Sequence, residues 1–182
     1  MFKKDTKTKV LLFLASHPYK EYYLREIAKN CSTVPSNAKR ALDDLHKSSL
    51  ITRVKKANLA LFKANLNSIT LKQIKICYAL NDLVESGLVE NVKQQLDATS
   101  IMLFGSVAKG EDDENSDIDI LVISKKPAKL DLSNFEKKLG KRINLITFTF
   151  IEWQKKAKED KPFYENVTLD GITLFGEKPV VL

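Results

Sequence analysis

Hydrophobic residues in the first third of the chain recur with the period of an α-helix. Three segments show this spacing, residues 6–16, 22–30 and 36–47. His17-Pro18 ends the first segment, because the residue before a proline avoids the helical region. Two runs typical of β-strands follow, "LITRV" and "LALFKA", joined by "KKAN". The pattern predicts three helices and then a β-hairpin.

The rest of the chain begins with a helical segment and then alternates between strand and helix patterns. Residues 66–97 have a helical period, broken near Gly87. Later apolar runs predict strands at 99–104, 118–123, 142–149 and 172–175, and helices at 133–139 and 151–158. The predicted fold is therefore α+β, with a first domain at 1–65, a helical linker at 66–97 and a small mixed-sheet α/β domain at 98–182. We expect the linker either to pack on one of the domains or to pair with a second copy as a homodimer.

Charge is distributed unevenly between the two predicted domains. Residues 1–65 hold 14 Lys and Arg against 5 Asp and Glu, a net charge of +9, whereas the remaining 117 residues have a net charge of −2. This asymmetry indicates that the first domain contacts a polyanion. No run approaches the roughly 18 apolar residues of a membrane span. Cys31 and Cys77 lie far apart in helical patterns, which does not suggest a disulfide, so we expect a cytoplasmic protein without membrane contacts.

Three helices and a hairpin of this order and length resemble a winged helix-turn-helix domain. The resemblance implies that the third helix enters the major groove of double-stranded DNA while the hairpin contacts the backbone. Asn37 and Arg40 suit bidentate contacts with adenine and guanine. The candidate DNA-binding residues are Ser36, Asn37, Lys39 and Arg40 on the helix, and Arg53, Lys55 and Lys56 on the hairpin. Winged helices also bind proteins, and the sequence leaves that alternative open.

The stretch "MLFGSVAKGEDDENSDIDILVIS", which begins at residue 102, carries the candidate chemistry. Residues two apart on a strand point to the same face, so Asp117 and Asp119 project together. Two carboxylates held this close are costly to keep ionised without a cation, and their oxygens suit Mg²⁺. Gly105-Ser106, at a strand end, lets the backbone approach a phosphate. The combination indicates metal-assisted phosphoryl or nucleotidyl transfer. The alternative is a solvated acidic turn that runs by chance into a strand.

"FGS" at 104–106, followed after ten residues by "DIDI" at 117–120, resembles the signature of the DNA polymerase β-like nucleotidyltransferase superfamily, especially its minimal stand-alone domains. The resemblance covers residues 98–178 or so. It implies that ATP or another nucleoside triphosphate binds, with Mg²⁺ as cofactor at one or two positions. Relatives of this size are often antitoxin-like, which implies a small helical toxin as partner. The resemblance gives nucleotide-binding roles to Gly105, Ser106, Lys109 and Ser116, and metal-binding and catalytic roles to Asp117 and Asp119.

Two positions depart from the family pattern. The family usually has a third carboxylate on the strand after the next helix, where this chain has Asn144; an amide offers a carbonyl oxygen but cannot act as a base. Many relatives have arginines at the positions that "GSVAKG" occupies here. Lys109 keeps the positive charge but cannot make the two parallel hydrogen bonds of a guanidinium, and Val107 has neither property. The chain is therefore a slow enzyme, an enzyme whose missing group comes from a partner or substrate, or a domain that only binds nucleotide.

Two functional hypotheses follow from these features. The first is an enzyme that transfers a nucleoside monophosphate, most simply AMP from ATP with Mg²⁺, to a hydroxyl on a protein or other acceptor. Asp117, Asp119 and Asn144 form its candidate catalytic set, and the N-terminal domain tethers it to DNA or to a partner. The rival is a DNA-binding transcriptional regulator whose second domain senses nucleotide without turnover. Asn144 favours the rival, whereas the intact Gly-Ser and Asp-x-Asp elements favour the enzyme.

Overall fold

The computed structural model describes residues 5–56 and 59–181. The chain divides into two compact units, Met1–Lys75 and Ile76–Leu182. The boundary falls within one helix, α4 (Ile69–Ser86). Within the described ranges, no helix is both long enough and apolar enough to cross a membrane.

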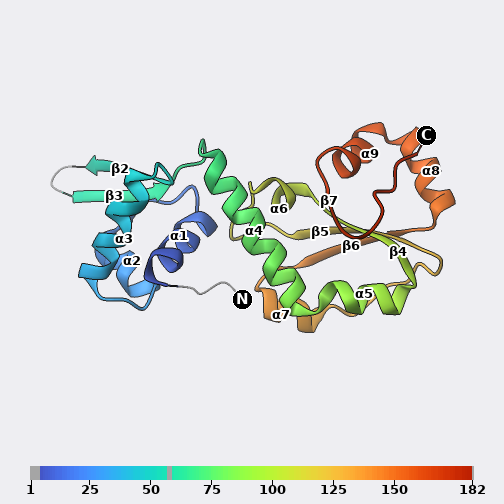
Figure 1. The fold of residues 1–182 in the computed structure, drawn as a ribbon, viewed down its shortest axis with the longest axis horizontal. Helices are drawn as coiled ribbons and strands as arrows, with labels where there is room; N and C mark the ends of the chain where they lie inside the picture. The colour runs from blue at the N-terminus through green and yellow to red at the C-terminus, as the bar shows by residue number, and fades with distance from the viewer. Residues whose placement is uncertain (1–4, 57–58, 182) are drawn as a thin grey trace. The chain divides into compact units, whose positions relative to one another are not determined.

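The N-terminal unit combines helices with a small antiparallel sheet (Figure 1). Its strands lie in the order β1-β3-β2, and β2 and β3 form the predicted hairpin. The three predicted helices are also present. The elements are α1 (Thr6–Ser16), β1 (Tyr22–Tyr23), α2 (Leu24–Asn30), α3 (Pro35–Lys47), β2 (Ile51–Lys56) and β3 (Leu59–Ala64).

Two local predictions in this unit were wrong. Tyr22 and Tyr23 belong to a strand, not to the second helix, because they pair with β3 and obtain their backbone hydrogen bonds there. Lys55 and Lys56 lie in β2 rather than in the hairpin turn. Residues 57–58, the rest of the predicted turn, are outside the described residues.

The third helix, α3, buries one face and exposes the other. Pro35 occupies its first turn, where the missing backbone N–H has no helical partner to lose. Its buried residues are Ala38, Ala41, Leu42 and Leu45. Ala41, Leu42 and Leu45 pack in one core with Val10 and Leu14 of α1. This packing leaves the polar residues of α3 on the surface.

The C-terminal unit is built around a mixed four-stranded sheet. Its strand order is β6-β5-β4-β7; β5 and β6 run parallel, whereas the other neighbouring pairs are antiparallel. The strands are β4 (Ala98–Phe104), β5 (Ile118–Ser124), β6 (Ile143–Phe148) and β7 (Ile172–Gly176), and the helices that follow α4 are α5 (Leu88–Leu96), α6 (Gly105–Lys109), α7 (Ser133–Leu139), α8 (Phe150–Glu159) and α9 (Lys161–Thr168). The mixed sheet was predicted; helix α9 was not.

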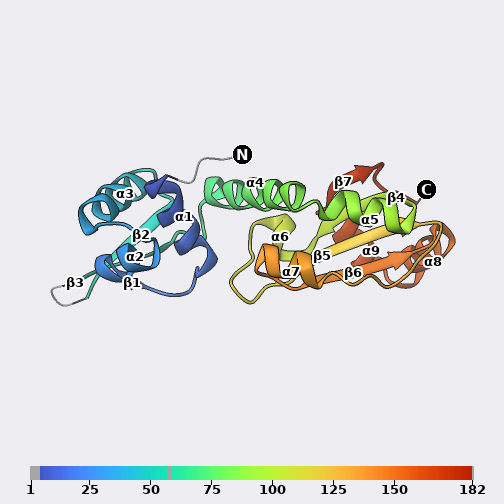
Figure 2. The same cartoon turned by 90° about the horizontal axis from the view of Figure 1, so that it is seen from below.

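Helices cover both faces of this sheet. Figure 1 shows α5 and α7 on one side and α8 and α9 on the other, and Figure 2 shows β5 and β6 lying alongside each other. Ile118, Ile120 and Val122 of β5 pack in the core that contains α5. Leu121 and Ile123 pack against Trp153 and Val167, which lie on α8 and α9, respectively. Alternation along β5 therefore places Asp119 on the α8–α9 face.

The predicted linker contributes to the core of the C-terminal unit. Leu83 of α4 and Leu88, Val92 and Leu96 of α5 are fully or almost fully buried there. Gly87 separates the two helices with a positive φ of 82°, a conformation that glycine adopts without strain. These residues explain why the unit begins well before its first strand.

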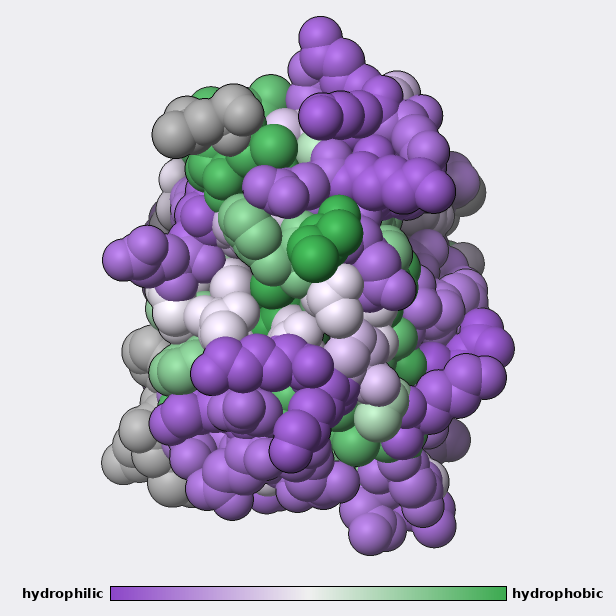
Figure 3. Space-filling model, turned by 90° about the vertical axis from the view of Figure 1, so that its right-hand side faces the viewer, coloured by the Kyte–Doolittle hydropathy of each residue, from purple (hydrophilic) through white to green (hydrophobic). Residues whose placement is uncertain are grey.

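The surface in Figure 3 is mainly hydrophilic. Hydrophobic side chains appear there as small groups interrupted by hydrophilic ones. Exposed apolar residues in the C-terminal unit include Phe150 and Ile151 of α8, Leu169 and Val180.

Candidate functional site

The first part of the candidate site is a tight turn between β4 and α6. Gly105 has a φ of 74°, in the left-handed region, and a Cβ atom placed there would lie 2.3 Å from Asp119 Oδ2. A side chain at this position would therefore be strained and would displace the Asp119 carboxylate. The sequence places glycine here because the backbone turn lies directly against the carboxylate.

Asp119 lies between two neighbouring strands. It is the second residue of β5, opposite Phe104 of β4 and Asn144 of β6. Asn144 Nδ2 donates a hydrogen bond to Asp119 Oδ1 at 2.9 Å. The Asp119 side chain is partly buried. Asn144 thus faces this aspartate, as its alternation with Ile143 and Leu145 predicts.

Asp117 comes just before β5, as the predicted strand at 118–123 implies. Its carboxylate pairs with Arg142, with Nε 3.2 Å from Oδ1. The Ile118 N–H donates to the carbonyl oxygen of Arg142 at 2.8 Å, which fixes the backbones of the two residues beside each other. The Asp117 side chain is 39% exposed and that of Arg142 is 80% exposed.

Arg142 was not among the predicted site residues. It lies two positions before Asn144, so an extended chain places both side chains on the same face. That spacing was a usable signal, but it becomes informative only once β6 is known to pair in parallel with β5. The pairing sets a guanidinium against Asp117 and an amide against Asp119.

The loop between the turn and Asp117 has its own hydrogen-bond network. The Asp113 N–H donates to Ser116 Oγ at 2.9 Å, and that hydroxyl donates to Asp113 Oδ1 at 3.0 Å. Hydrogen bonds from the Asn115 N–H and the Ser116 hydroxyl hold the pKa of Asp113 below its usual value. Lys141 ion-pairs with Asp112 at 3.0 Å and donates to the carbonyl oxygen of Asp113. The Ser116 hydroxyl, a predicted nucleotide contact, is therefore engaged within its own loop.

The other predicted nucleotide-binding residues lie on α6. Ser106 follows Gly105 and is partly exposed. Lys109, at the end of the helix, forms an ion pair with Asp170 at 2.8 Å. The structure thus brings Gly105, Asp119 and Asn144 together, with Asp117 two residues before Asp119, whereas Lys109 is held by a different carboxylate.

The donor set at this site fits a hard divalent cation completed by a ligand. The described ranges contain no cluster of three or more His, Cys, Asp and Glu side chains arranged to hold a metal ion. Mg²⁺ commonly takes only one or two carboxylates from the protein and completes its shell with water and substrate phosphates. Asp117 and Asp119 supply two carboxylates of that kind, and a cation, the Arg142 guanidinium, lies against Asp117.

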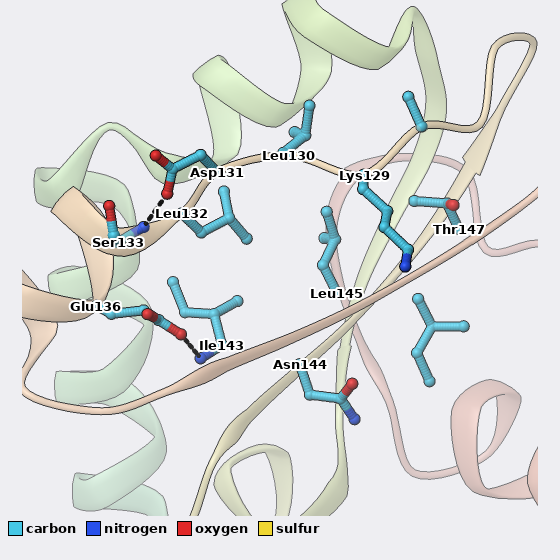
Figure 4. A pocket seen from close by; sticks show the side chains of 12 residues that line it. Lys129, Leu130, Asp131, Leu132, Ser133, Glu136, Ile143, Asn144, Leu145 and Thr147 are labelled. Atoms are coloured by element: carbon cyan, nitrogen blue, oxygen red, sulfur yellow. Dashed lines mark hydrogen bonds between the residues drawn. The ribbon is translucent and has the colours of Figure 1, made fainter.

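A cavity of about 590 Å³ lies beside the outer strand, β6 (Figure 4). Residues 128–133 line one wall, and Glu136 accepts a hydrogen bond from the Ile143 N–H at 2.9 Å. Figure 4 shows Ile143 and Leu145 on one side of the strand and the Asn144 side chain on the other. The bulk of the cavity therefore lies on the opposite face of β6 from the carboxylate site.

The predicted DNA-binding residues are exposed in the N-terminal unit. On α3 they form a polar face opposite the buried one, made of Ser36, Asn37, Lys39 and Arg40. On β2, the Arg53 guanidinium carbon lies 5.9 Å from the centre of the Phe62 ring, and Lys56 forms an ion pair with Glu21 at 2.6 Å. The hydrogen bond between these partners raises the pKa of Lys56 and lowers that of Glu21. Lys55 is also exposed on this strand.

Comparison with known proteins supports nucleotidyl transfer as the general chemistry. Residues 85–164, less than half of the chain, match a family model described as "Nucleotidyltransferase domain". This segment contains the Gly105 turn, both aspartates and Asn144. No curated protein matches the chain. A solved structure described as "Crystal structure of the toxin-antitoxin with AMP-PNP" is 20% identical over 54% of this chain and 74% of that chain, with a TM-score of 0.34.

Proposed function

We propose that the C-terminal unit is a Mg²⁺-dependent nucleotidyltransferase that transfers a nucleoside monophosphate, most simply AMP from ATP, to a hydroxyl on a protein or another acceptor. One observation carries the proposal: the Gly105 turn lies directly against the Asp119 carboxylate, with the Cβ position of residue 105 only 2.3 Å from Asp119 Oδ2. Backbone that can contact phosphate and a carboxylate that can bind its metal ion are therefore adjacent. The family-model match at 85–164 supports the same chemistry.

In the proposed reaction, the acceptor oxygen attacks the α-phosphorus of the nucleotide. A new P–O bond forms while the bond to the bridging oxygen breaks, and pyrophosphate leaves. The Gly105-Ser106 turn would orient the triphosphate, and Asp117 and Asp119 would hold Mg²⁺, which would neutralise phosphate charge. The proton of the acceptor hydroxyl cannot go to Asn144, because an amide is not a base. We assign that proton to a group of the acceptor or of a partner, for which a small helical toxin is our candidate.

A second function is favoured by the hydrogen bond between Asn144 and Asp119. The amide donates to Asp119 Oδ1 at 2.9 Å and so occupies one of the oxygens that a metal ion would use. If neither the acceptor nor a partner supplies a base, a domain with this arrangement would bind nucleotide without turnover. The protein would then be a nucleotide-sensing regulator, in which bound nucleotide changes DNA binding.

Both functions use the N-terminal unit in the same way. We propose that it is a winged helix-turn-helix module that binds double-stranded DNA, with α3 in the major groove and β2 against the backbone. The exposed polar face of α3 and the exposed cations of β2 support this assignment. Lys56 is a weaker phosphate contact than its position suggested, since Glu21 already holds it.

Transfer of radiolabel from α-labelled ATP to components of a cell extract, with Mg²⁺ present, tests the enzyme hypothesis. We expect label on an acceptor with the wild-type chain and none with Asp119→Asn. Glu159→Gln is the control, because Glu159 is an exposed α8 carboxylate paired with Lys155. If calorimetry detects Mg²⁺-dependent ATP binding but no label is transferred, the sensor function replaces the enzyme. If neither binding nor transfer occurs, both functions are wrong.

A further inference from the structure

The segment that leads into β6 places a cation against a carboxylate that the proposed function assigns to metal. Arg142 Nε lies 3.2 Å from Asp117 Oδ1, while Asn144, two residues later, donates to Asp119. Each carboxylate is thus matched by one donor from the same edge of β6. Only the partner of Asp117 carries a positive charge, so Arg142 would compete with a metal ion for the Asp117 carboxylate.

The contact between Arg142 and Asp117 is weak enough to exchange. The Arg142 side chain is 80% exposed. Exposed ion pairs are screened by water, and breaking one shifts an equilibrium by roughly fivefold at most. The backbone of Arg142 is anchored, because its carbonyl oxygen accepts from the Ile118 N–H at 2.8 Å. The guanidinium can therefore swing on a fixed Cα without any change in the sheet.

Arg142 is also chemically suited to the ligand proposed for this site. A guanidinium donates two parallel hydrogen bonds to phosphate oxygens, which an ammonium cannot do. Lys109, the cation at the end of α6, lacks this fork and pairs with Asp170 at 2.8 Å rather than with either site carboxylate. A metal ion that binds Asp117 would break its ion pair with Arg142. The freed guanidinium would then lie close to the nucleotide phosphates that bind the same metal ion.

We propose that Arg142 is an exchangeable internal cation: it neutralises Asp117 in the nucleotide-free protein, and it moves to the triphosphate when a divalent cation and nucleotide bind. This inference rests on the proposed function. It adds Arg142, which pairs first with Asp117 and then with the triphosphate. It predicts that loss of Arg142 affects the metal ion and the nucleotide in opposite directions. A residue that only stabilises the fold would weaken both.

The test compares two binding measurements on the full chain and its Arg142→Gln variant. The first is Mn²⁺ affinity without nucleotide, from the electron paramagnetic resonance signal of free Mn²⁺. The second is calorimetric affinity for α,β-methylene-ATP with Mg²⁺, because that analogue cannot transfer its nucleoside monophosphate. We expect Mn²⁺ binding to tighten by up to roughly fivefold when the competing cation is removed. We expect analogue binding to weaken by about tenfold, as for a lost hydrogen bond to a charged group.

Two further variants separate charge from geometry. Arg142→Lys keeps the positive charge but not the fork, so it should leave Mn²⁺ affinity near the wild-type value and still weaken analogue binding. Lys155→Gln, an exposed α8 cation paired with Glu159, should change neither affinity. Melting curves followed by circular dichroism confirm that each variant is folded.

The remaining outcomes distinguish this inference from the proposed function. If the wild type binds both ligands and Arg142→Gln changes both affinities in the same direction, or neither, the Arg142 proposal is overturned and the metal site stands. If the folded wild type binds neither Mn²⁺ nor the analogue, the Arg142 proposal and the metal-dependent function are overturned together.

Discussion

Replacing Asn144 by aspartate probes the contact that distinguishes this site most clearly. In the wild type, the Asn144 amide donates to Asp119 Oδ1 at 2.9 Å. In Asn144→Asp, a carboxylate oxygen replaces the amide nitrogen, so two negatively charged oxygens face each other at about the same separation. A donor–acceptor contact becomes a repulsive one, unless a cation lies between the two groups.

The expected cost has two parts. Loss of a hydrogen bond to a charged group costs about 1.5–3 kcal/mol, and we take the lower end because Asn144 is exposed. Repulsion between unit charges about 3 Å apart in water adds roughly 1 kcal/mol. Without metal, the free energy of unfolding should fall by about 2.5 kcal/mol, which corresponds to a decrease of roughly 10 °C in the melting temperature of a unit of this size.

Thermal melting in chelator and in Mg²⁺ measures this effect. Mg²⁺ should recover most of the stability lost in Asn144→Asp, because three carboxylates bind it more tightly than two. Asn144→Ala is the matched control: it removes the hydrogen bond and frees Asp119 Oδ1 without adding charge, so its Mg²⁺ response should rise only slightly above that of the wild type and stay well below that of Asn144→Asp. A new positioned base should also raise nucleotidyl transfer by about 10²–10⁴-fold.

Two results would refute this reasoning. If Mg²⁺ stabilises Asn144→Asp and Asn144→Ala equally, residue 144 does not face a metal site. If the wild type transfers nucleotide at an ordinary rate and Asn144→Asp does not change that rate, the chain does not lack a base at this position.

Three further predictions concern separate parts of the chain. Gly105→Ala should abolish nucleotide binding, because the added Cβ meets Asp119 Oδ2 at 2.3 Å; calorimetry checks this, and unchanged affinity would contradict the role of the turn. DNA binding should weaken steeply with salt; in mobility-shift titrations Arg40→Ala should lose sequence preference, whereas Lys55→Ala should weaken all sequences alike. Cys31 should resist alkylation at neutral pH while exposed Cys77 reacts, because burial raises the pKa of the Cys31 thiol. Mass spectrometry of the labelled peptides checks this, and labelling of Cys31 as fast as that of Cys77 would contradict it.

The sequence by itself determined most elements and singled out the glycine and the two aspartates of the candidate site. Apolar periods are local, so they located α3 and β5 to within a residue or so. The pair Asp117 and Asp119, and the glycine before Ser106, were visible because carboxylates and glycine are unusual beside apolar strands. Local patterns failed at Tyr22-Tyr23, where pairing with a strand some forty residues later outweighed a helical period.

Only the tertiary structure decided which side chains meet at the site. Asp117 faces Arg142 and Asp119 faces Asn144 because β6 pairs in parallel with β5 in one particular register, and a shift by one residue would turn both partners away. The engagement of Lys109 by Asp170 likewise depends on how a distant loop returns to the sheet. Such contacts join residues that are far apart in sequence, and their geometry comes from strand order and core packing, which no local pattern encodes.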